Sequence, residues 1–253
     1  MSSAVDNHAY DAIGTGYARR RQPDPRFASS LYAALGDAST VLNVGAGAGS
    51  YEPDDRCVIA VEPSNVMIAQ RRPASAPVVC ARADALPFPD ASFDAVMAVL
   101  TVHHWPDRRG AFAELRRVAD RRVVLTFDPT VHNCMWLMDY IPEIAQLESA
   151  RAPSIGEVLD AIEGGSVVVL PVPHDCRDGM TIAHWRHPEA YLDDEIHLGG
   201  SALRQVDGAA LHRGLARLAR DLHSGRWFRK YGHLVQHSEL DCGLRLVVGA
   251  RRG

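Results

Sequence analysis

The chain has 253 residues, of which 47% are hydrophobic and 23% are charged, and its formal net charge is −4. These values are ordinary for a globular protein and exclude a disordered, collagen-like or fibrous chain. No apolar stretch approaches the length of about eighteen residues that a membrane-spanning helix needs. Residues 1–12 contain no basic segment followed by an apolar one, so no secretory signal is predicted. The composition therefore favours a cytoplasmic enzyme or binding protein.

Basic residues are scattered along the chain rather than gathered in one segment. All but one of the 27 are arginine, with Lys230 the only lysine, and many form pairs such as Arg71-Arg72 that alternate with acidic residues. A protein that follows a phosphate backbone concentrates its basic residues on one face and usually carries a positive net charge. We therefore expect no nucleic-acid partner.

The five cysteines are odd in number and form no Cys-x-x-Cys pair. Cys57 and Cys80 stand in apolar, strand-like runs. Buried free thiols and a reducing compartment are the expectation.

Short β-branched runs alternate with helical segments in the first half of the chain. The predicted strands are 40–44, 57–61, 78–80, 93–99 and 122–127. Ser64 can cap a helix that continues to Arg72, and residues 109–119 place Phe112, Leu115 and Val118 at near-helical spacing. Strand–helix alternation of this kind predicts an α/β fold with a parallel sheet covered on both faces.

The second half is organised differently. Residues 154–163 are predicted to be helical, and strands are predicted at 167–170 and 243–248. Residues 174–241 lie between these strands, show no further strand alternation, and are too many for a plain connection. We therefore predict a mostly helical cap at 174–241, inserted into a sheet domain formed by 38–173 and 242–253.

A glycine-rich turn follows the first predicted strand. Gly45, Gly47 and Gly49 let the backbone bend sharply and approach a ligand without Cβ clashes. Their G-x-G-x-G spacing differs from the G-x-G-x-x-G that seats a pyrophosphate in dinucleotide-binding folds. Glu62 ends the second strand, where a carboxylate can accept hydrogen bonds from a ribose diol. Asp84 follows the third strand, where it can receive an adenine amino group.

Together these segments resemble the class I S-adenosylmethionine-dependent methyltransferases. The resemblance is closest to the group of ubiquinone, menaquinone and natural-product methyltransferases (methyltransferase type 11). It covers about residues 38–128 and rests on VLNVGAGAGSYEP, VIAVEPS, ADALPFPDASFDAV, LTVHHWPD and ELRRV. It implies a Rossmann-like, doubly wound sheet of seven strands, mostly parallel with an antiparallel C-terminal strand, and a role in secondary metabolism.

The resemblance also implies which residues hold the cofactor, S-adenosylmethionine, and its product S-adenosylhomocysteine. Glycine-loop residues would line the methionine and ribose, Glu62 would hold the ribose hydroxyls, and Leu100 would meet the methionine end. Residues 1–37 would form lid helices, in which Tyr17 covers the cofactor and Arg21 meets its carboxylate. The alternative for this segment is a plain surface helix with solvated arginines. The full implied set is Tyr17, Arg21, Gly45, Ala46, Gly47, Glu62, Pro63, Met67, Asp84, Ala85 and Leu100.

One position departs from the family pattern. Asn43 stands where the family usually has Asp or Glu, an acid that helps to hold the cofactor's ammonium group. The asparagine keeps a hydrogen-bond acceptor but loses the charge.

Residues for the acceptor side are less sharply defined. In this fold acceptors usually meet the cofactor after the fourth strand, where His103 and His104 stand, and either histidine could be a general base or simple loop packing. Asp128, at the end of the fifth strand, could contact the substrate or cap a helix. The aromatic residues that could wall a pocket for a flat acceptor, or only pack the cap, are Trp136, Trp185, Tyr191 and Trp227.

Metal binding is not predicted. The segments 174–176 and 184–187 contain histidines, but neither has a second partner at convincing spacing.

The leading hypothesis is an enzyme that methylates a small, aromatic or heteroaromatic metabolite at carbon, nitrogen or oxygen, acting as a monomer or homodimer. Two alternatives stay open. One is a cofactor-binding partner protein without catalysis, which Asn43 motivates. The other is an RNA or protein methyltransferase, against which the acidic charge balance counts.

Overall fold

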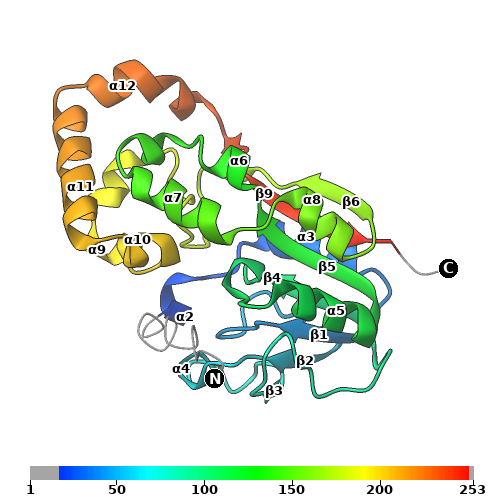
Figure 1. The fold of residues 1–253 in the computed structure, drawn as a ribbon. Coiled ribbons are helices and arrows are strands. Elements are labelled where there is room, and N and C mark those ends of the chain that lie inside the picture. Colours follow the sequence, from blue (N-terminus) through cyan, green and yellow to red (C-terminus); the bar gives the residue numbers. More distant parts are fainter. Residues whose placement is uncertain (1–16, 251–253) are drawn as a thin grey trace.

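A seven-stranded sheet forms the centre of the molecule in the computed structural model, which describes residues 17–250 and, for Tyr17 and Ala18, the backbone only (Figure 1). In spatial order the strands are β3 (Val78–Val79), β2 (Cys57–Val61), β1 (Thr40–Val44), β4 (Phe93–Val99), β5 (Ala119–Phe127), β9 (Leu244–Gly249) and β6 (Gly165–Val169). The first five strands in this order, from β3 through β2, β1 and β4 to β5, pair in parallel. Strand β9 is antiparallel to both of its neighbours, β5 and β6. The predicted doubly wound, mostly parallel sheet with an antiparallel C-terminal strand is confirmed.

The chain leaves β1 toward one edge of the sheet and returns to β4 on the other side of β1. Ligands of such sheets bind outside the carboxyl ends of the strands at this reversal point. The glycine turn follows β1 and Leu100 follows β4, so both lie at that position.

Neighbouring apolar residues along a strand pack on opposite faces of the sheet. On one face Val41, Met97 and Leu125 pack in the same cluster as α3 (Pro25–Leu35). On the other face Leu42 and Val96 pack with α5 (Arg108–Val118) and α8 (Ile155–Ala161). Each central strand therefore reads as a continuous apolar run because both of its faces are covered.

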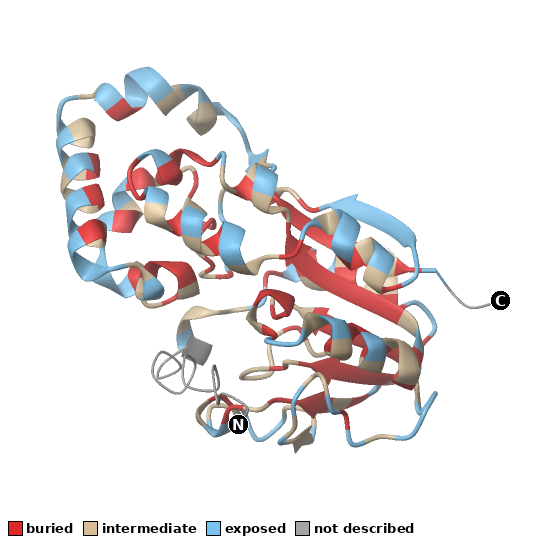
Figure 2. Ribbon diagram, viewed as in Figure 1, coloured by how far each residue is buried: buried red, intermediate tan, exposed pale blue. Residues whose placement is uncertain are grey.

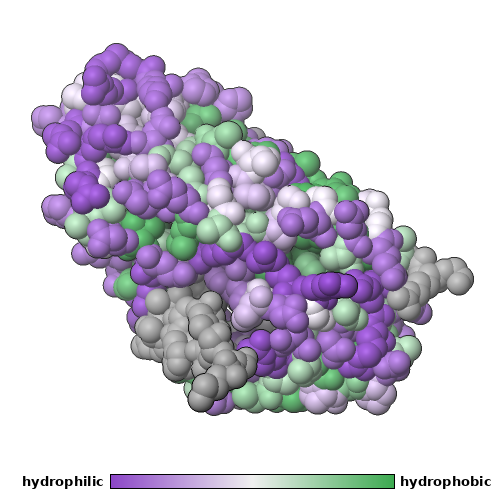
Figure 3. Space-filling view, viewed as in Figure 1, coloured by the Kyte–Doolittle hydropathy of each residue, from purple (hydrophilic) through white to green (hydrophobic). Residues whose placement is uncertain are grey.

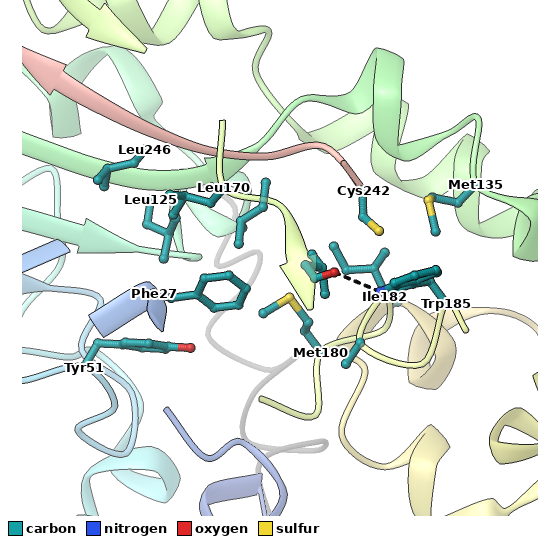
Figure 4. Close-up of a cluster of buried hydrophobic side chains, with 14 of the residues drawn as sticks. Phe27, Tyr51, Leu125, Met135, Leu170, Met180, Ile182, Trp185, Cys242 and Leu246 are labelled. Atoms are coloured by element: carbon teal, nitrogen blue, oxygen red, sulfur yellow. Dashed lines mark hydrogen bonds between the residues drawn. The ribbon is translucent and has the colours of Figure 1, made fainter. Parts of the chain in front are cut away.

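A helical layer lies beside the sheet, at the upper left in Figure 1. It comprises α6 (Pro129–His132), η2 (Trp136–Asp139), α7 (Pro142–Arg151), η3 (Pro188–Leu192), α9 (Asp194–His197), α10 (Ser201–Gln205), α11 (Gly208–His223), α12 (Arg226–Tyr231) and η4 (Gly232–Gln236). One hydrophobic cluster runs from Phe27 through Met180 to Trp185, and Figure 4 shows these side chains side by side. The helical layer and the sheet therefore share a core. The proposed division of the chain at residues 173 and 174 stays a prediction.

Local signals in the sequence set several element boundaries. Ser64 caps the short helix α4 (Asn65–Ile68), and Ser154 forms a capping box with Glu157 at the start of α8. Strand β5 begins three residues before its predicted start. A further small sheet pairs β7 (Val172–Pro173) with β8 (Glu239–Leu240), and β8 lies within 174–241, where no strand was predicted.

The expectation of buried thiols is wrong for most of the cysteines. Cys57, Cys80 and Cys134 are exposed, Cys176 is half-buried, and only Cys242 is buried, all five as free thiols. Cys57 is the first, exposed residue of β2, and Cys80 follows the last residue of the edge strand β3, so neither lies where the sheet is covered.

The edge strand β6 is exposed along its whole length, as the pale blue arrow in Figure 2 shows. Its three valines, Val167, Val168 and Val169, are large hydrophobic residues that lie exposed on the surface. In the space-filling view, hydrophobic side chains gather at this edge, whereas the surface over α11 and α12 is hydrophilic (Figure 3).

The turn after β1 depends on glycine. Gly45 has a φ of +71°, and a Cβ at this position would lie 2.1 Å from the Thr101 Oγ1 atom. We predict that Gly45→Ala lowers the free energy of unfolding by more than about 2 kcal/mol, from left-handed strain and steric displacement together. Gly208→Ala is the control, because Gly208 starts α11 and a Cβ there would meet no atom within 4 Å. Urea unfolding of both variants is the measurement, and equal stability of the two would contradict the prediction.

Candidate functional site

A cleft lies outside the carboxyl ends of β1, β2 and β4, at the reversal point of the sheet. It holds about 1130 Å³ of space that no protein atom fills, its open mouth included. Nine of the predicted cofactor residues line it: Arg21, Gly45, Ala46, Gly47, Glu62, Pro63, Met67, Asp84 and Leu100. We call this space the donor cleft.

Glu62 is fixed against the glycine turn. Its carboxylate accepts hydrogen bonds from the Gly47 amide at 2.8 Å and from the Ser64 amide at 2.9 Å, and only 7% of the residue is exposed. A carboxylate oxygen has more than one lone pair, so these bonds leave acceptor capacity toward the cleft. The same residue therefore shapes the loop and presents a hydrogen-bond acceptor.

Asp84 also lines the cleft, in a two-bond ion pair with Arg82 at 2.9 and 2.8 Å. The hydrogen bond from Arg82 lowers the pKa of the Asp84 carboxyl below its ordinary value. Asp84 is therefore an ionised acceptor at neutral pH.

Arg21 lines the cleft and is ion-paired with a buried carboxylate. Its guanidinium pairs with Asp178, which is 1% exposed, and Asp178 also accepts a hydrogen bond from the Tyr51 hydroxyl at 2.8 Å. Burial, and the nearby Asp178 charge, raise the pKa of Tyr51, which keeps its proton and remains a donor. The Asp24 amide donates to the same hydroxyl at 3.2 Å. Sequence analysis singled out Arg21 but missed Tyr51 and Asp178.

A second cavity adjoins the donor cleft and shares Arg21, Leu100 and His104 with it. Its remaining lining residues come from the ends of β4, β5 and β9 and from the helical layer: His103, Phe127, His132, Glu148, Met180, Thr181, Ile182, Ser201 and Leu244. About 510 Å³ of space there is free of protein atoms, its open side included. We call it the acceptor cavity.

The two predicted histidines lie at different depths. His104 lines both spaces, whereas His103 lines only the acceptor cavity, and their rings are 3.9 Å apart between centroids. Burial lowers the pKa of His103 well below its ordinary value and that of His104 to about 3. Both imidazoles are therefore neutral at pH 7 and can accept a hydrogen bond.

Leu100 is held in an unusual backbone conformation where the two spaces meet. Its φ is +51°, and its amide donates to the Leu125 carbonyl at 2.7 Å. A non-glycine residue in this region costs of order 1–3 kcal/mol and persists only when its surroundings enforce it. Tyr51, which also lines the donor cleft, has a similarly unusual backbone conformation, with a φ of +62°.

Comparisons with known proteins agree with this geometry. A family model described as "Methyltransferase domain" matches residues 42–127. A crystal structure described as a candidate methyltransferase from an antibiotic biosynthesis pathway of Anabaena variabilis ATCC 29413 is 30% identical. Its TM-score is 0.86, and the match covers 92% of this chain and all of that chain. The chain belongs to the S-adenosylmethionine-dependent methyltransferases.

More distant structures share the fold of this methyltransferase. A candidate histamine N-methyltransferase from Thermotoga maritima is 23% identical over 62% of this chain and 78% of that chain, with a TM-score of 0.50. Phosphoethanolamine N-methyltransferase 2 of Haemonchus contortus, solved with S-adenosylhomocysteine, is 12% identical over 97% of this chain and 57% of that chain, with a TM-score of 0.55. No protein of curated function matches the chain significantly.

The donor cleft fits the cofactor, S-adenosylmethionine, by its own chemistry. Gly45 and Gly47 line the cleft with backbone alone, and two carboxylates, Glu62 and Asp84, line it as acceptors for hydroxyl and amino groups. The Asn43 Oδ1 atom is buried and has no hydrogen-bond partner within residues 17–250. A ligand that carries hydroxyl, amino and ammonium groups meets all of these acceptors.

Several predicted site residues lie elsewhere. Ala85 is exposed and is not among the residues lining the donor cleft. Asp128 caps α6 by accepting from the Thr130 amide at 2.9 Å, and it is not among the lining residues of either space. The side chain of Tyr17 lies outside the described part of the chain.

Of the two alternatives for the four aromatic residues, a pocket wall or packing of the cap, their contacts match packing. Trp136 lies 5.3 Å from Trp227 and 5.4 Å from Tyr191 between ring centroids. The Trp136 indole donates to the Trp185 carbonyl. The Trp185 indole donates to the Val172 carbonyl at 3.0 Å, the dashed line in Figure 4. All four are at most 4% exposed, and the structure brings none of them to the acceptor cavity.

The described part of the chain offers neither a metal centre nor a membrane span. Residues 17–250 contain no group of three or more His, Cys, Asp or Glu side chains placed to hold a metal ion. Over the same range, none of the helices has the length and apolar character needed to cross a membrane.

The buried histidines make stability depend on pH. The unfolded chain binds a proton at His104 near pH 6.5 whereas the folded protein does so only near pH 3, so stability is lost as the pH falls below about 6.5. Between pH 7 and pH 5, wild type should lose about 2 kcal/mol more than His104→Gln, which removes this titration. Urea unfolding at both pH values measures the difference. His212→Gln, an exposed site on α11, is the control, and the same pH slope in all three proteins would contradict the prediction.

Proposed function

We propose that this methyltransferase methylates a small, aromatic or heteroaromatic molecule bound in the acceptor cavity. The observation that carries the proposal is the shared boundary of the two spaces, formed by Arg21, Leu100 and His104. Methyl transfer requires the acceptor atom and the methyl donor to meet across one such boundary. The second cavity is lined by strand ends and by the helical layer together, and such a concave site favours a small molecule over a polymer.

The donor cleft holds the cofactor through the residues expected from the family. Glu62 binds the ribose hydroxyls, Asp84 the adenine amino group, and Leu100 lies at the methionine end, with Pro63 and Met67 beside the adenine. When bound, S-adenosylmethionine supplies a methyl group on a positively charged sulfur, which leaves as a neutral thioether and needs no acid. The protein's main contribution is therefore alignment, which can contribute up to about 7–11 kcal/mol.

Phe127, Met180 and Ile182 give the acceptor cavity apolar walls, against which a flat ring can pack and which exclude water from the reacting atoms. Thr181 and Ser201 supply hydroxyl groups that fix the orientation of a polar substituent. These residues, rather than the tryptophans of the packed core, position the acceptor.

His104 is our candidate proton acceptor because it lines both spaces and is neutral at pH 7. A base with so low a pKa accepts only a strongly acidic proton. The O–H or heteroaromatic N–H of an acceptor becomes strongly acidic as its oxygen or nitrogen bonds to the methyl carbon, and its proton then passes to the imidazole. The resulting imidazolium then returns the proton to solvent. Methylation at a carbon or at an unprotonated nitrogen would not need this step during the transfer itself.

The function is tested by incubating the protein and S-adenosylmethionine with a panel of phenols and nitrogen heteroaromatics, and measuring release of S-adenosylhomocysteine. Release of S-adenosylhomocysteine with phenols or with nitrogen heteroaromatics supports the proposal. Turnover only with RNA or protein acceptors, added as separate arms, would contradict it.

Filling the acceptor cavity should separate its role from that of the donor cleft. Ser201 lines only the acceptor cavity, so Ser201→Phe should lower turnover at least tenfold and leave S-adenosylhomocysteine affinity within about twofold. Ser224→Phe, at the exposed end of α11, is the matched control. Unchanged turnover in Ser201→Phe would place the acceptor elsewhere.

Glu62→Ala should weaken S-adenosylhomocysteine binding by about 1–3 kcal/mol, through loss of hydrogen bonds to a charged acceptor. Isothermal titration calorimetry measures the affinity, and thermal unfolding without ligand shows whether the glycine turn has loosened. Glu189→Ala, an exposed residue of η3, is the control. An affinity equal to that of wild type would count against the ribose role of Glu62.

A further inference from the structure

Asn43, the residue that departs from the family pattern, has a charged neighbour behind the donor cleft. Its Nδ2 atom donates to Glu52 Oε1 at 3.1 Å, and Asn43 itself is 1% exposed on the lining of the cleft. The bond to a carboxylate, which can only accept, decides which side of the amide faces Glu52. The oxygen, Oδ1, is left buried without a hydrogen-bond partner within residues 17–250.

Glu52 is held in place from several sides. Arg71 donates to its two oxygens at 2.8 and 2.9 Å, and the Ala76 amide donates at 3.1 Å. The side chains of Arg71 and Glu52 are 5% and 7% exposed. Arg71 also donates to the Gly47 carbonyl at 3.3 Å. A buried ion pair thus links the glycine turn to the Asn43 amide.

A buried acceptor without a partner costs free energy unless a ligand supplies the missing donor. Hydrogen bonds in a chain also polarise one another, so donation from Asn43 to Glu52, which is ion-paired with Arg71, makes Oδ1 a stronger acceptor. We infer that Glu52 is a positioning residue for the cofactor's ammonium group, orienting and polarising Asn43 so that its Oδ1 accepts the ammonium hydrogen bond. The family carries a negative charge at position 43 itself. Here that charge lies behind Asn43, on the side chain of Glu52 to which Asn43 donates.

This inference rests on the proposed placement of the cofactor in the donor cleft and does not depend on the acceptor. Three probes report on it by calorimetry. S-adenosylhomocysteine has an amino group and a carboxylate, decarboxylated S-adenosylmethionine has the amino group alone, and 5′-methylthioadenosine has neither.

Glu52→Gln should weaken both amine-bearing probes about tenfold and leave 5′-methylthioadenosine within about twofold. Its side chain can donate as well as accept, so it no longer fixes the Asn43 amide. Asn43→Leu, which removes the acceptor without changing charge, should give the same selective loss. Glu157→Gln, at the exposed start of α8, is the control and should leave all three affinities unchanged.

The double variant Asn43→Asp/Glu52→Gln exchanges the carboxylate and the amide and keeps one carboxylate near Arg71. It should regain wild-type affinity for the amine-bearing probes, and it remains informative if Glu52→Gln alone does not fold. Equal loss for all three probes in Glu52→Gln and Asn43→Leu, with no recovery in the double variant, would show a purely structural role and overturn the inference. If Glu62→Ala also leaves the wild-type affinity for S-adenosylhomocysteine intact, the placement of the cofactor fails instead.

Discussion

The buried carboxylate of Asp178 joins parts of the chain that are far apart in sequence. It pairs with Arg21 of the N-terminal segment and accepts from Tyr51, which follows the glycine turn. Breaking a buried ion pair by removing one partner typically costs about 3–5 kcal/mol, because the other charge stays buried. The sheet supplies only the floor of the two spaces, whereas a wall of the acceptor cavity comes from Met180 and Ile182, which follow Asp178 closely. Because Arg21 and Tyr51 line the donor cleft, their bonds to Asp178 also hold in place the wall against which an acceptor would pack.

The sheet and the donor cleft could be predicted from the sequence because their signals are local. Runs such as 40–44 and 93–99 reveal covered strands, Ser64 marks a helix start, and the glycines after Val44 mark a turn that only glycine adopts without strain. The acceptor cavity could not be predicted in this way. Its residues His132, Met180 and Ser201 meet only through the tertiary fold, and none stands in a recognisable motif.

The role of the aromatic residues could not be predicted from the sequence either. A tryptophan in a helical segment packs equally well in a core or a pocket wall, and the sequence does not encode which neighbours complete its environment. Trp136 and Trp185 are joined by a hydrogen bond from an indole to a main-chain carbonyl, which satisfies the polar atom inside an apolar core. Their burial stabilises the helical layer that walls the acceptor cavity, so they serve the site through packing rather than contact.

Two of the four non-glycine residues with a positive φ among residues 17–250 line the donor cleft. They are Leu100 and Tyr51. Each is held by a hydrogen bond to another part of the chain, Leu100 to Leu125 in β5 and Tyr51 to Asp178. The contacts that define the cleft are thus the same contacts that offset its strain. A variant that releases either bond should therefore change the shape of the cleft before it unfolds the sheet, because the strands keep their own pairing and their covered faces.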